Sequence, residues 1–349
     1  MAKDWIQYVN KEGELTEGKE IALERTECLA LYELMVTCRV FEHKATVLQR
    51  QGFLGTYASG LGQEAAQVGS ASVLQKNDWL FPYGRDLGAA IVAGIPIDSV
   101  FLWLMGHQER WLTPSDIHVH VVPPAVEVAS QIPHAVGVAW STKLRREPQI
   151  SLCYFGDGAT SKGDFHEAVN MAAVFQVPVV FFCENNQWAI STPFARQTAV
   201  ESIADKASAY GLPSFRIDGN DVLAVYQTVK DVTEKMRETY QPVLIEAVTY
   251  RLDAHTTADD PRRYRTDDEV DRWRQLDPLI RAKSYLIRYH QWSESEDDAL
   301  INKIRKRVDD AWQRANDKPP SRLASVFHHV FYSQTTDLKQ QESEVQQDG

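Results

Sequence analysis

The 349-residue sequence has few cysteines and no pattern that would pair them. They are Cys28, Cys38, Cys153 and Cys183, and none belongs to a C-x-x-C pair. Disulfide frameworks are typical of short secreted chains, and C-x-x-C pairs are typical of zinc and redox sites. We therefore exclude a disulfide scaffold and expect buried free thiols in a reducing compartment, the cytoplasm.

Long apolar runs and an excess of positive charge are also missing. The most apolar region, 87–106, contains Pro96, Asp98 and Ser99, which a membrane-spanning helix does not readily accept. The first ten residues lack the apolar core of a secretory signal. Lys and Arg number 37 against 48 Asp and Glu, a net charge of −11. We expect no membrane association and no dedicated nucleic-acid binding, which needs a basic surface.

Two common phosphate-binding fingerprints are absent as well. Lys162 is followed by Gly163 rather than by Ser or Thr, which excludes a P-loop. Ser161 stands where the third glycine of a G-x-G-x-x-G motif would be. The sequence therefore disfavours a stand-alone binder of ATP or NAD.

The middle of the sequence alternates short apolar runs with helical patterns. Continuous apolar strands separated by helices indicate a parallel sheet that is covered on both faces. We therefore predict an α/β fold, a parallel sheet flanked by helices. The predicted strands are 150–155, 177–183, 214–217 and 243–250, and the helices between them are 164–175 and 221–238.

Helical patterns flank this middle part, so we expect N- and C-terminal helical extensions. Apolar residues three and four positions apart indicate that residues 1–50 are largely helical. Ser293-x-x-Glu296 is a capping box that begins a C-terminal helix, and Pro319 ends it. We also predict helices at 63–77 and 87–105, an irregular stretch at 106–127, one domain over 1–332, and a loose polar tail over 333–349.

Two polar turns follow neighbouring predicted strands. Asp157 lies between Gly156 and Gly158 after one strand, and Asn186 follows the next strand. Parallel neighbours end at the same sheet edge, where Asp157 and Asn186 would supply the oxygen ligands that Mg²⁺ prefers. The backbone N–H groups of Gly158 and Ala159 can receive phosphate oxygens. These residues indicate a magnesium–diphosphate site, and the alternative is a pair of glycine- and asparagine-rich turns without a ligand.

The segment from Gly156 to Pro193 resembles the thiamin diphosphate motif of thiamin-dependent enzymes. Over about residues 25–325, the chain is similar to the alpha subunits of the 2-oxo acid dehydrogenases, and most similar to those of bacterial pyruvate dehydrogenases. The resemblance implies the diphosphate-binding domain of the thiamin diphosphate-binding fold. Supporting stretches are 62–65, 82–86, 131–137 and 250–265.

The resemblance implies two cofactors, thiamin diphosphate and Mg²⁺. Asp157 and Asn186 match the metal ligands, and the backbone carbonyl of Trp188, which replaces the usual Tyr, matches the third. The diphosphate would contact Gly156, Gly158, Ala159, Asn186 and Arg85, and the backbone of Val128 matches a contact to the aminopyrimidine.

His255 matches the active-site histidine of a mobile loop, which also approaches the cofactor. Thr256 falls where some relatives carry a regulatory phosphoserine, and Thr56 and Tyr57 match the substrate-proximal segment. The alternatives are an ion pair of Arg85 with Asp86, a polar loop role for His255, and a solvated face for Arg262, Arg263 and Arg265. His118-x-His120 has too few ligands for a metal site, so we expect a loop there.

The sequence departs from the family pattern at three places. Gly84 stands where a tyrosine usually precedes the diphosphate arginine, and Tyr83 lies one place earlier. Residues 110–122 replace a Gly-Gly-Ser-Met-His stretch, and Thr56 stands where close relatives often have Phe. We expect the first change to affect one hydrogen bond to the phosphate. Because of these departures, the sequence does not predict the size of the substrate.

The resemblance implies decarboxylation of a 2-oxo acid and transfer of the acyl group to a lipoyl-bearing acyltransferase. The glutamate that activates thiamin belongs to a separate pyrimidine-binding domain, which implies a beta subunit and an α2β2 heterotetramer. Pyruvate is the first substrate we expect. The alternatives are a branched-chain 2-oxo acid, acetoin, or a non-catalytic interaction subunit.

The loop that carries His255 provides a test of the cofactor prediction. We expect the loop to become ordered when thiamin diphosphate and Mg²⁺ bind, so limited proteolysis at Arg262 and Arg263 should slow when both are added. Unchanged cleavage rates would contradict this expectation.

Overall fold

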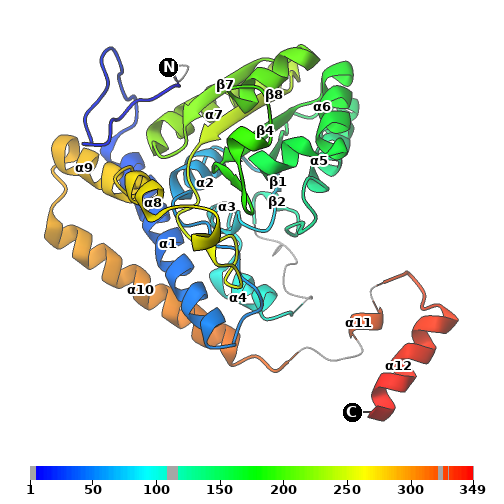
Figure 1. Ribbon diagram of the computed structural model, residues 1–349. Coiled ribbons are helices and arrows are strands. Elements are labelled where there is room, and N and C mark those ends of the chain that lie inside the picture. Colours follow the sequence, from blue (N-terminus) through cyan, green and yellow to red (C-terminus); the bar gives the residue numbers. More distant parts are fainter. Residues whose placement is uncertain (1–4, 108–116, 321–324, 329, 349) are drawn as a thin grey trace.

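The computed structural model describes residues 5–107, 117–320, 325–328 and 330–348, and its centre is a six-stranded parallel sheet (Figure 1). The strand order is β2-β1-β3-β4-β8-β7. The sheet confirms the α/β fold class and all four predicted strands. It adds two strands too short to be recognised as apolar runs. The bounds are β1 Trp79–Phe81, β2 His120–Val121, β3 Ser151–Gly156, β4 Val179–Asn185, β7 Ser214–Asp218 and β8 Val243–Val248.

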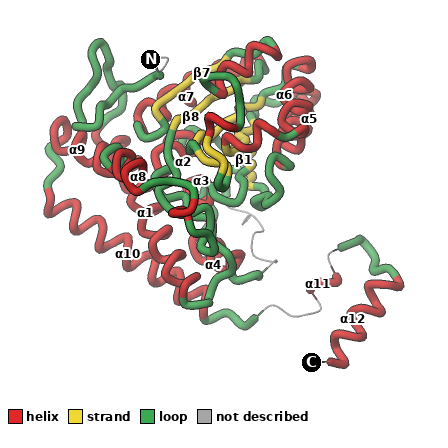
Figure 2. Tube along the Cα trace, viewed as in Figure 1, coloured by secondary structure: helices red, strands yellow, loops and turns green. Residues whose placement is uncertain are grey.

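Helices cover both faces of the sheet and extend beyond it (Figures 1 and 2). The N-terminal part contains α1 Arg25–Arg50, α2 Glu64–Ala71, α3 Leu87–Val92 and α4 Ile97–Leu104. The middle contains α5 Gln131–Arg145, α6 Gly163–Phe175 and α7 Val222–Thr239. The C-terminal part contains α8 Asp267–Arg274, α9 Pro278–His290, α10 Glu294–Asn316, α11 Ser325–His328 and α12 Thr336–Asp348. No helix in the described ranges is long and apolar enough to cross a bilayer.

The strand side chains alternate between two separate hydrophobic clusters. Cys153 and Phe155 of β3 pack with α5 and α6, whereas Leu152 and Tyr154 pack with α1, α2 and α7. Both faces are thus buried, which explains why these strands are apolar at successive positions. Burial of a side chain such as Phe155 contributes about 1.5–3 kcal/mol to stability.

The segment before α1 is not helical, so that part of the prediction is wrong. Ile6 instead forms a parallel bridge with Ile217 of β7, and the Tyr8 and Val9 N–H groups each donate to the Asp221 carboxylate at 2.7 Å. Gly13 takes a left-handed conformation with φ +79°, which ends any helical course there. This segment therefore lies along the edge of the sheet.

The C-terminal region confirms one prediction and corrects another. Ser293 and Glu296 form the predicted capping box at the start of α10. The polar tail is not loose, because it forms α12, where the Leu338 N–H donates to the Thr335 hydroxyl at the helix start. Figure 1 shows α11 and α12 standing apart from the body. Glutamine, glutamate and lysine are good helix formers, which accounts for a helix without a buried face.

A buried carboxylate ties the amino edge of the sheet together. Asp78 is fully buried beside β1, and its two oxygens accept from the Arg237 guanidinium of α7 at 2.8 and 2.6 Å. The Ile150 N–H donates to the same carboxylate at 3.0 Å. Asp78 thus joins β1, the start of β3 and α7, and it depends on Arg237 for charge compensation.

Removal of this guanidinium should leave a buried charge without its counter-ion. For the Arg237→Met variant we expect unfolding free energy to fall by about 3–5 kcal/mol in urea denaturation. The matched control is Arg274→Met, because Arg274 pairs with Asp271 at 2.7 Å with both side chains more than 60% exposed. The control should lose less than about 1 kcal/mol, and equal losses would contradict the account.

Candidate active site

Four neighbouring strands, β1, β3, β4 and β8, lead into predicted site residues at one edge of the sheet. These residues are Arg85, Asp157, Asn186 and His255. Gly156 of β3 pairs with Glu184 of β4, so Asp157 and Asn186 leave the sheet side by side, as expected. Asn185 pairs with Val248 of β8, whose following loop carries His255, and β1 next to β3 leads into Arg85. This is the carboxyl edge, where open α/β sheets bind ligands.

Asp157 is an almost completely buried carboxylate. It is 1% exposed, begins the 3-10 turn η2 Asp157–Ser161, and accepts a 2.5 Å hydrogen bond from Gln197 Nε2. Burial raises the pKa of Asp157 to about 6, although this hydrogen bond and the nearby Arg251 charge act in the opposite direction. Above that pH the site holds a carboxylate whose charge is removed from water, which favours a cation there.

The other two predicted metal ligands lie in the turn after β4. Asn186 is 2% exposed, its Nδ2 donates to Gln63 Oε1 at 3.2 Å, and its Oδ1 accepts from the Trp188 N–H at 3.3 Å. The Trp188 carbonyl accepts from Arg251 Nη1 at 3.2 Å. All three oxygen-bearing groups are therefore close to the same sheet edge and shielded from solvent.

Gly156 and Gly158 lie in close contact with neighbouring segments of the chain. A Cβ on Gly158 would lie 2.6 Å from the Ala189 Cβ, so only glycine fits beneath the β5–β6 hairpin, Trp188–Ala189 and Thr192–Pro193. Ala159 is buried in the cluster of α5 and α6. The Tyr83 hydroxyl lies 3.3 Å from where a Cβ on Gly156 would be. Tyr83 thus reaches the turn although its position in the sequence is one residue early.

Arg85 supplies positive charge to the same edge. It is 3% exposed, and its Nη2 donates to the His255 carbonyl at 3.0 Å and lies 3.2 Å from His255 Nδ1. Its Nη1 donates to the Ser59 carbonyl. Arg85 Nε and Gln63 Nε2 are buried, with no hydrogen-bond partner in the described part of the chain. Buried donors without acceptors suit an anion, so the residues fit a diphosphate opposite the oxygen ligands.

His255 is held as a neutral imidazole. Burial, together with the Arg85 and Arg251 guanidinium groups, lowers the pKa of His255 to about 4. Because both arginines donate toward Nδ1, the remaining proton is assigned to Nε2. At neutral pH the ring can therefore donate one hydrogen bond from Nε2 without adding positive charge.

Two arginines fix the loop around His255. Arg265 is 8% exposed and donates to the backbone carbonyls of Arg251, Leu252 and Asp253. Arg251 is fully buried and donates to the Ile190 carbonyl at 2.7 Å. Arg262, by contrast, has an 80% exposed side chain and pairs with Asp260. The sequence left open whether these arginines order the loop or lie on a solvated face. Arg265 orders the loop, and Arg262 lies on a solvated face.

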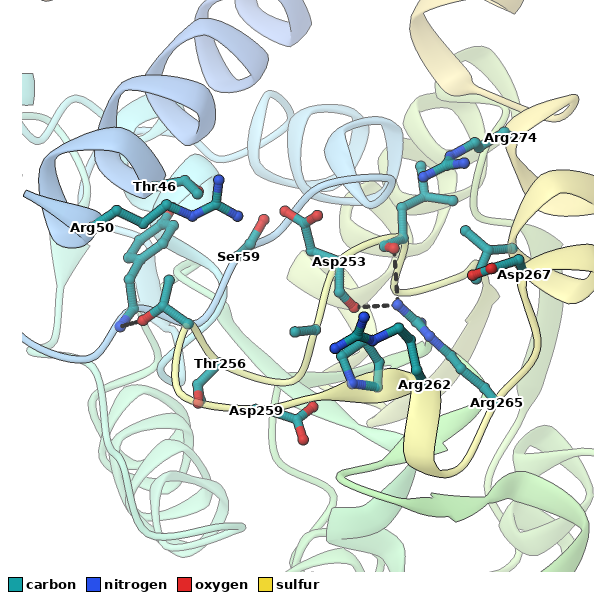
Figure 3. A pocket seen from close by; sticks show the side chains of 16 residues that line it. Thr46, Arg50, Ser59, Asp253, Thr256, Asp259, Arg262, Arg265, Asp267 and Arg274 are labelled. Carbon is teal, nitrogen blue, oxygen red and sulfur yellow. Dashed lines mark hydrogen bonds between the residues drawn. The ribbon is translucent and has the colours of Figure 1, made fainter.

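The outer side of this loop borders a polar cavity of about 330 Å³. Figure 3 shows Arg265 with its bonds to the Leu252 and Asp253 carbonyls, and Ser59 and Asp253 on facing segments. Thr256 and Tyr57 also line the cavity. The Thr257 N–H donates to the Tyr57 carbonyl at 2.9 Å, so the two segments predicted to lie near the substrate are adjacent.

Three predicted residues lie less directly at the site. The Tyr57 ring is 1% exposed and packs on Phe41, so it is largely core, and Thr56 is exposed. Val128 is 49% exposed on the loop between β2 and α5.

His120 packs on Trp79 at 4.5 Å between ring centroids, and the described ranges contain no group of three or more His, Cys, Asp or Glu side chains that could hold a metal ion. Part of the 110–122 departure, residues 110–116, lies outside the described residues.

Comparison with known proteins decides the family. The sequence model of the family described as "Dehydrogenase E1 component" matches residues 32–324. The chain belongs to the dehydrogenase E1 component family. It is an alpha subunit of the thiamin diphosphate-dependent 2-oxo acid dehydrogenases, which are oxidoreductases.

Individual relatives agree with this membership. The chain is 45% identical to "3-methyl-2-oxobutanoate dehydrogenase subunit alpha" of Mycobacterium tuberculosis, over 90% of this chain and 85% of the relative. It is 37% identical to "Pyruvate dehydrogenase E1 component subunit alpha" of Acholeplasma laidlawii, over 95% and 96%. It is 35% identical to the protein of the same name from Staphylococcus aureus, over 97% and 91%.

The E1 site also contains residues that the sequence analysis did not single out as ligands or partners. Gln63 contacts Asn186, Gln197 contacts Asp157, and Arg251 contacts both the Trp188 carbonyl and His255. Each acts through a hydrogen bond from another part of the chain. The one available signal was the position of Gln63 and Arg251 inside the stretches that carry the family resemblance.

Replacement of Asp157 by Asn should separate stability from ligand binding. Since the folded protein raises the pKa of Asp157 from 3.8 to about 6, it binds this proton more tightly than the unfolded chain does, and ionisation destabilises the ligand-free fold. In EDTA at about pH 8, we expect Asp157→Asn to be more stable than wild type by about 1–3 kcal/mol, a gain that vanishes below about pH 4.

Thermal unfolding with and without ligands checks the other half of this prediction. Thiamin diphosphate with Mg²⁺ should raise the melting temperature of wild type and leave that of Asp157→Asn unchanged. A variant that gains as much as wild type would contradict the assignment of Asp157.

Proposed function

We propose that this chain is the cofactor-binding alpha subunit of a pyruvate dehydrogenase, which decarboxylates its 2-oxo acid on thiamin diphosphate with Mg²⁺. One observation carries the proposal: buried oxygen ligands at the ends of β3 and β4 lie at the same sheet edge as buried donors of Arg85 and Gln63 that lack acceptors in the described chain. A metal-bound diphosphate is the ligand that satisfies both sets at once.

The roles of the residues follow from their chemistry. We assign Mg²⁺ to Asp157, Asn186 and the Trp188 carbonyl, and the diphosphate oxygens to Arg85 and the backbone N–H groups of Gly156, Gly158 and Ala159. The backbone of Val128, in the loop before α5, would hold the aminopyrimidine. When bound, the cofactor supplies the electron sink for loss of carbon dioxide, and the protein supplies orientation and charge.

His255 is the residue that we assign to hydrogen bonding and proton transfer beside the reacting atoms. Its Nε2–H can stabilise negative charge that develops on a substrate oxygen. An anion bound to Arg85 would offset one of the two positive charges that lower the pKa of His255. The bound anion would thereby move that pKa back toward 6.5 and make the imidazole a better base.

The proposed partners are a beta subunit, in an α2β2 heterotetramer, and a lipoyl-bearing acyltransferase. The relatives are named as alpha subunits, which supports a second type of chain. The described ranges contain one parallel sheet, and its carboxyl edge is where a pyrimidine-binding domain with its glutamate would have to meet this chain.

Two substrates remain, each supported by a different relative. Pyruvate is supported by the relatives from Acholeplasma and Staphylococcus, which match over more than nine tenths of both chains. 3-Methyl-2-oxobutanoate is supported by the mycobacterial relative at the higher identity of 45%. An apolar pocket separates such substrates by only about 10–200-fold per methylene, so competition is the decisive assay.

Co-expression with the beta subunit tests the proposed function. We expect 2-oxo acid decarboxylation with an artificial electron acceptor to require thiamin diphosphate and Mg²⁺ and to fall at least about 100-fold in Asp157→Ala. A pyruvate dehydrogenase should prefer pyruvate when 3-methyl-2-oxobutanoate competes. The reverse preference would select the branched-chain enzyme, and a folded complex without activity or cofactor binding would overturn the proposal.

A further inference from the structure

The hairpin after Asn186 closes over the Asp157 turn. Its two strands, β5 and β6, pair Trp188 with Pro193, and the chain then passes through η3, Phe194–Arg196, to Gln197. Ala189 packs over Gly158, where a Cβ would lie 2.6 Å away. The segment from Trp188 to Gln197 therefore places the Trp188 carbonyl, at its start, and the Gln197 amide, at its end, beside the Asp157 turn.

Gln197 is fixed from its own hairpin and aimed at Asp157. Its backbone N–H donates to the Phe194 carbonyl at 2.9 Å, and its Nε2 donates to the Thr192 carbonyl at 3.1 Å. The same Nε2 donates to Asp157 Oδ2 at 2.5 Å. Because the amide nitrogen is shared between the Thr192 carbonyl and Asp157, it can hold the carboxylate in one rotamer.

The oxygen of this amide accepts no hydrogen bond from the described part of the chain. Gln197 Oε1 is buried, lacks a hydrogen-bond partner among the described residues, and lies 3.8 Å from where a Cβ on Gly158 would be. An orphaned buried acceptor is unfavourable unless a donor reaches it. Mg²⁺ usually keeps water in its coordination shell, and such a water is a donor of the right kind.

We infer that Gln197 is a positioning residue for the metal: it engages Oδ2 of Asp157, leaves Oδ1 for monodentate coordination, and accepts from a water of the bound cation. This inference rests on the proposed function. It assigns a role to a side chain that contacts neither substrate nor diphosphate and acts through Asp157 and the cation's hydration shell.

The test is Mg²⁺ affinity, measured by isothermal titration of the alpha–beta complex in the presence of thiamin diphosphate. Gln197→Met keeps the length and removes both polar atoms, whereas Gln197→Asn keeps an amide that is too short to reach Asp157. We expect both variants to raise the Mg²⁺ dissociation constant by about 10–100-fold. The turnover number at saturating Mg²⁺ should stay within about threefold of wild type, since the reacting atoms are untouched.

The matched control is Gln227→Met. Gln227 donates to the Asp231 carboxylate at 2.8 Å, the same pair of groups as Gln197 and Asp157, but on the exposed face of α7. Its Mg²⁺ affinity should equal that of wild type. Wild-type Mg²⁺ affinity in Gln197→Met, or in Gln197→Asn if the first variant fails to fold, would overturn the inference alone. A wild-type complex that binds no thiamin diphosphate would overturn the proposed function, and this inference with it.

Discussion

A buried negative charge at the end of β3 is the constraint on which the rest of the site depends. Asp157 is removed from water, and burial raises its pKa to about 6, so the ligand-free protein is destabilised when this carboxylate ionises. The neighbouring features answer that constraint. Gln197 donates to one oxygen, Gly158 leaves room for the hairpin, and Asn186 and the Trp188 carbonyl add oxygens beside it. Together these groups favour a divalent cation as a ligand beside the Asp157 carboxylate.

The charges around Asp157 require an anion as well as a cation. Arg85, Arg251 and Arg265 are all less than 10% exposed and lie in or under the loop that carries His255. The carboxyl groups beneath offset them only in part, because burial raises the pKa of Asp86 to about 7 and that of its neighbour Glu184 well above the usual range. Arg85 consequently binds neutral acceptors, the His255 and Ser59 carbonyls, while its Nε lacks a partner in the described chain. The same electrostatics keeps His255 neutral, so cofactor binding and the state of the histidine are coupled through one guanidinium group.

The sequence predicts the parts of this arrangement that local pattern controls. The runs that became β3 and β4 are continuously apolar, and their parallel pairing brings Asp157 and Asn186 together without further information. Arg85 and His255 required the family resemblance, because a single arginine or histidine has no distinguishing pattern. Gln63, Gln197 and Arg251 were not assigned, since their roles come from hydrogen bonds between segments far apart in the chain. The segment before α1 and the tail that forms α12 differ from the prediction for other reasons. The helical periodicity lies in α1 alone, and bridges to the sheet edge determine the course of the segment before it. In the tail, helix propensity outweighs polarity.

The central claim is that the carboxyl edge of the sheet binds a metal-bound diphosphate between Asp157 and Arg85. The most direct test is a crystal structure of the complex with its beta subunit, grown with thiamin diphosphate and with Mn²⁺ in place of Mg²⁺. The account predicts an anomalous peak coordinated by the Asp157 carboxylate, the Asn186 side-chain oxygen and the Trp188 carbonyl, with Arg85 turned from His255 to the diphosphate. A metal peak elsewhere, or a diphosphate that leaves Arg85 on the His255 carbonyl, would contradict it.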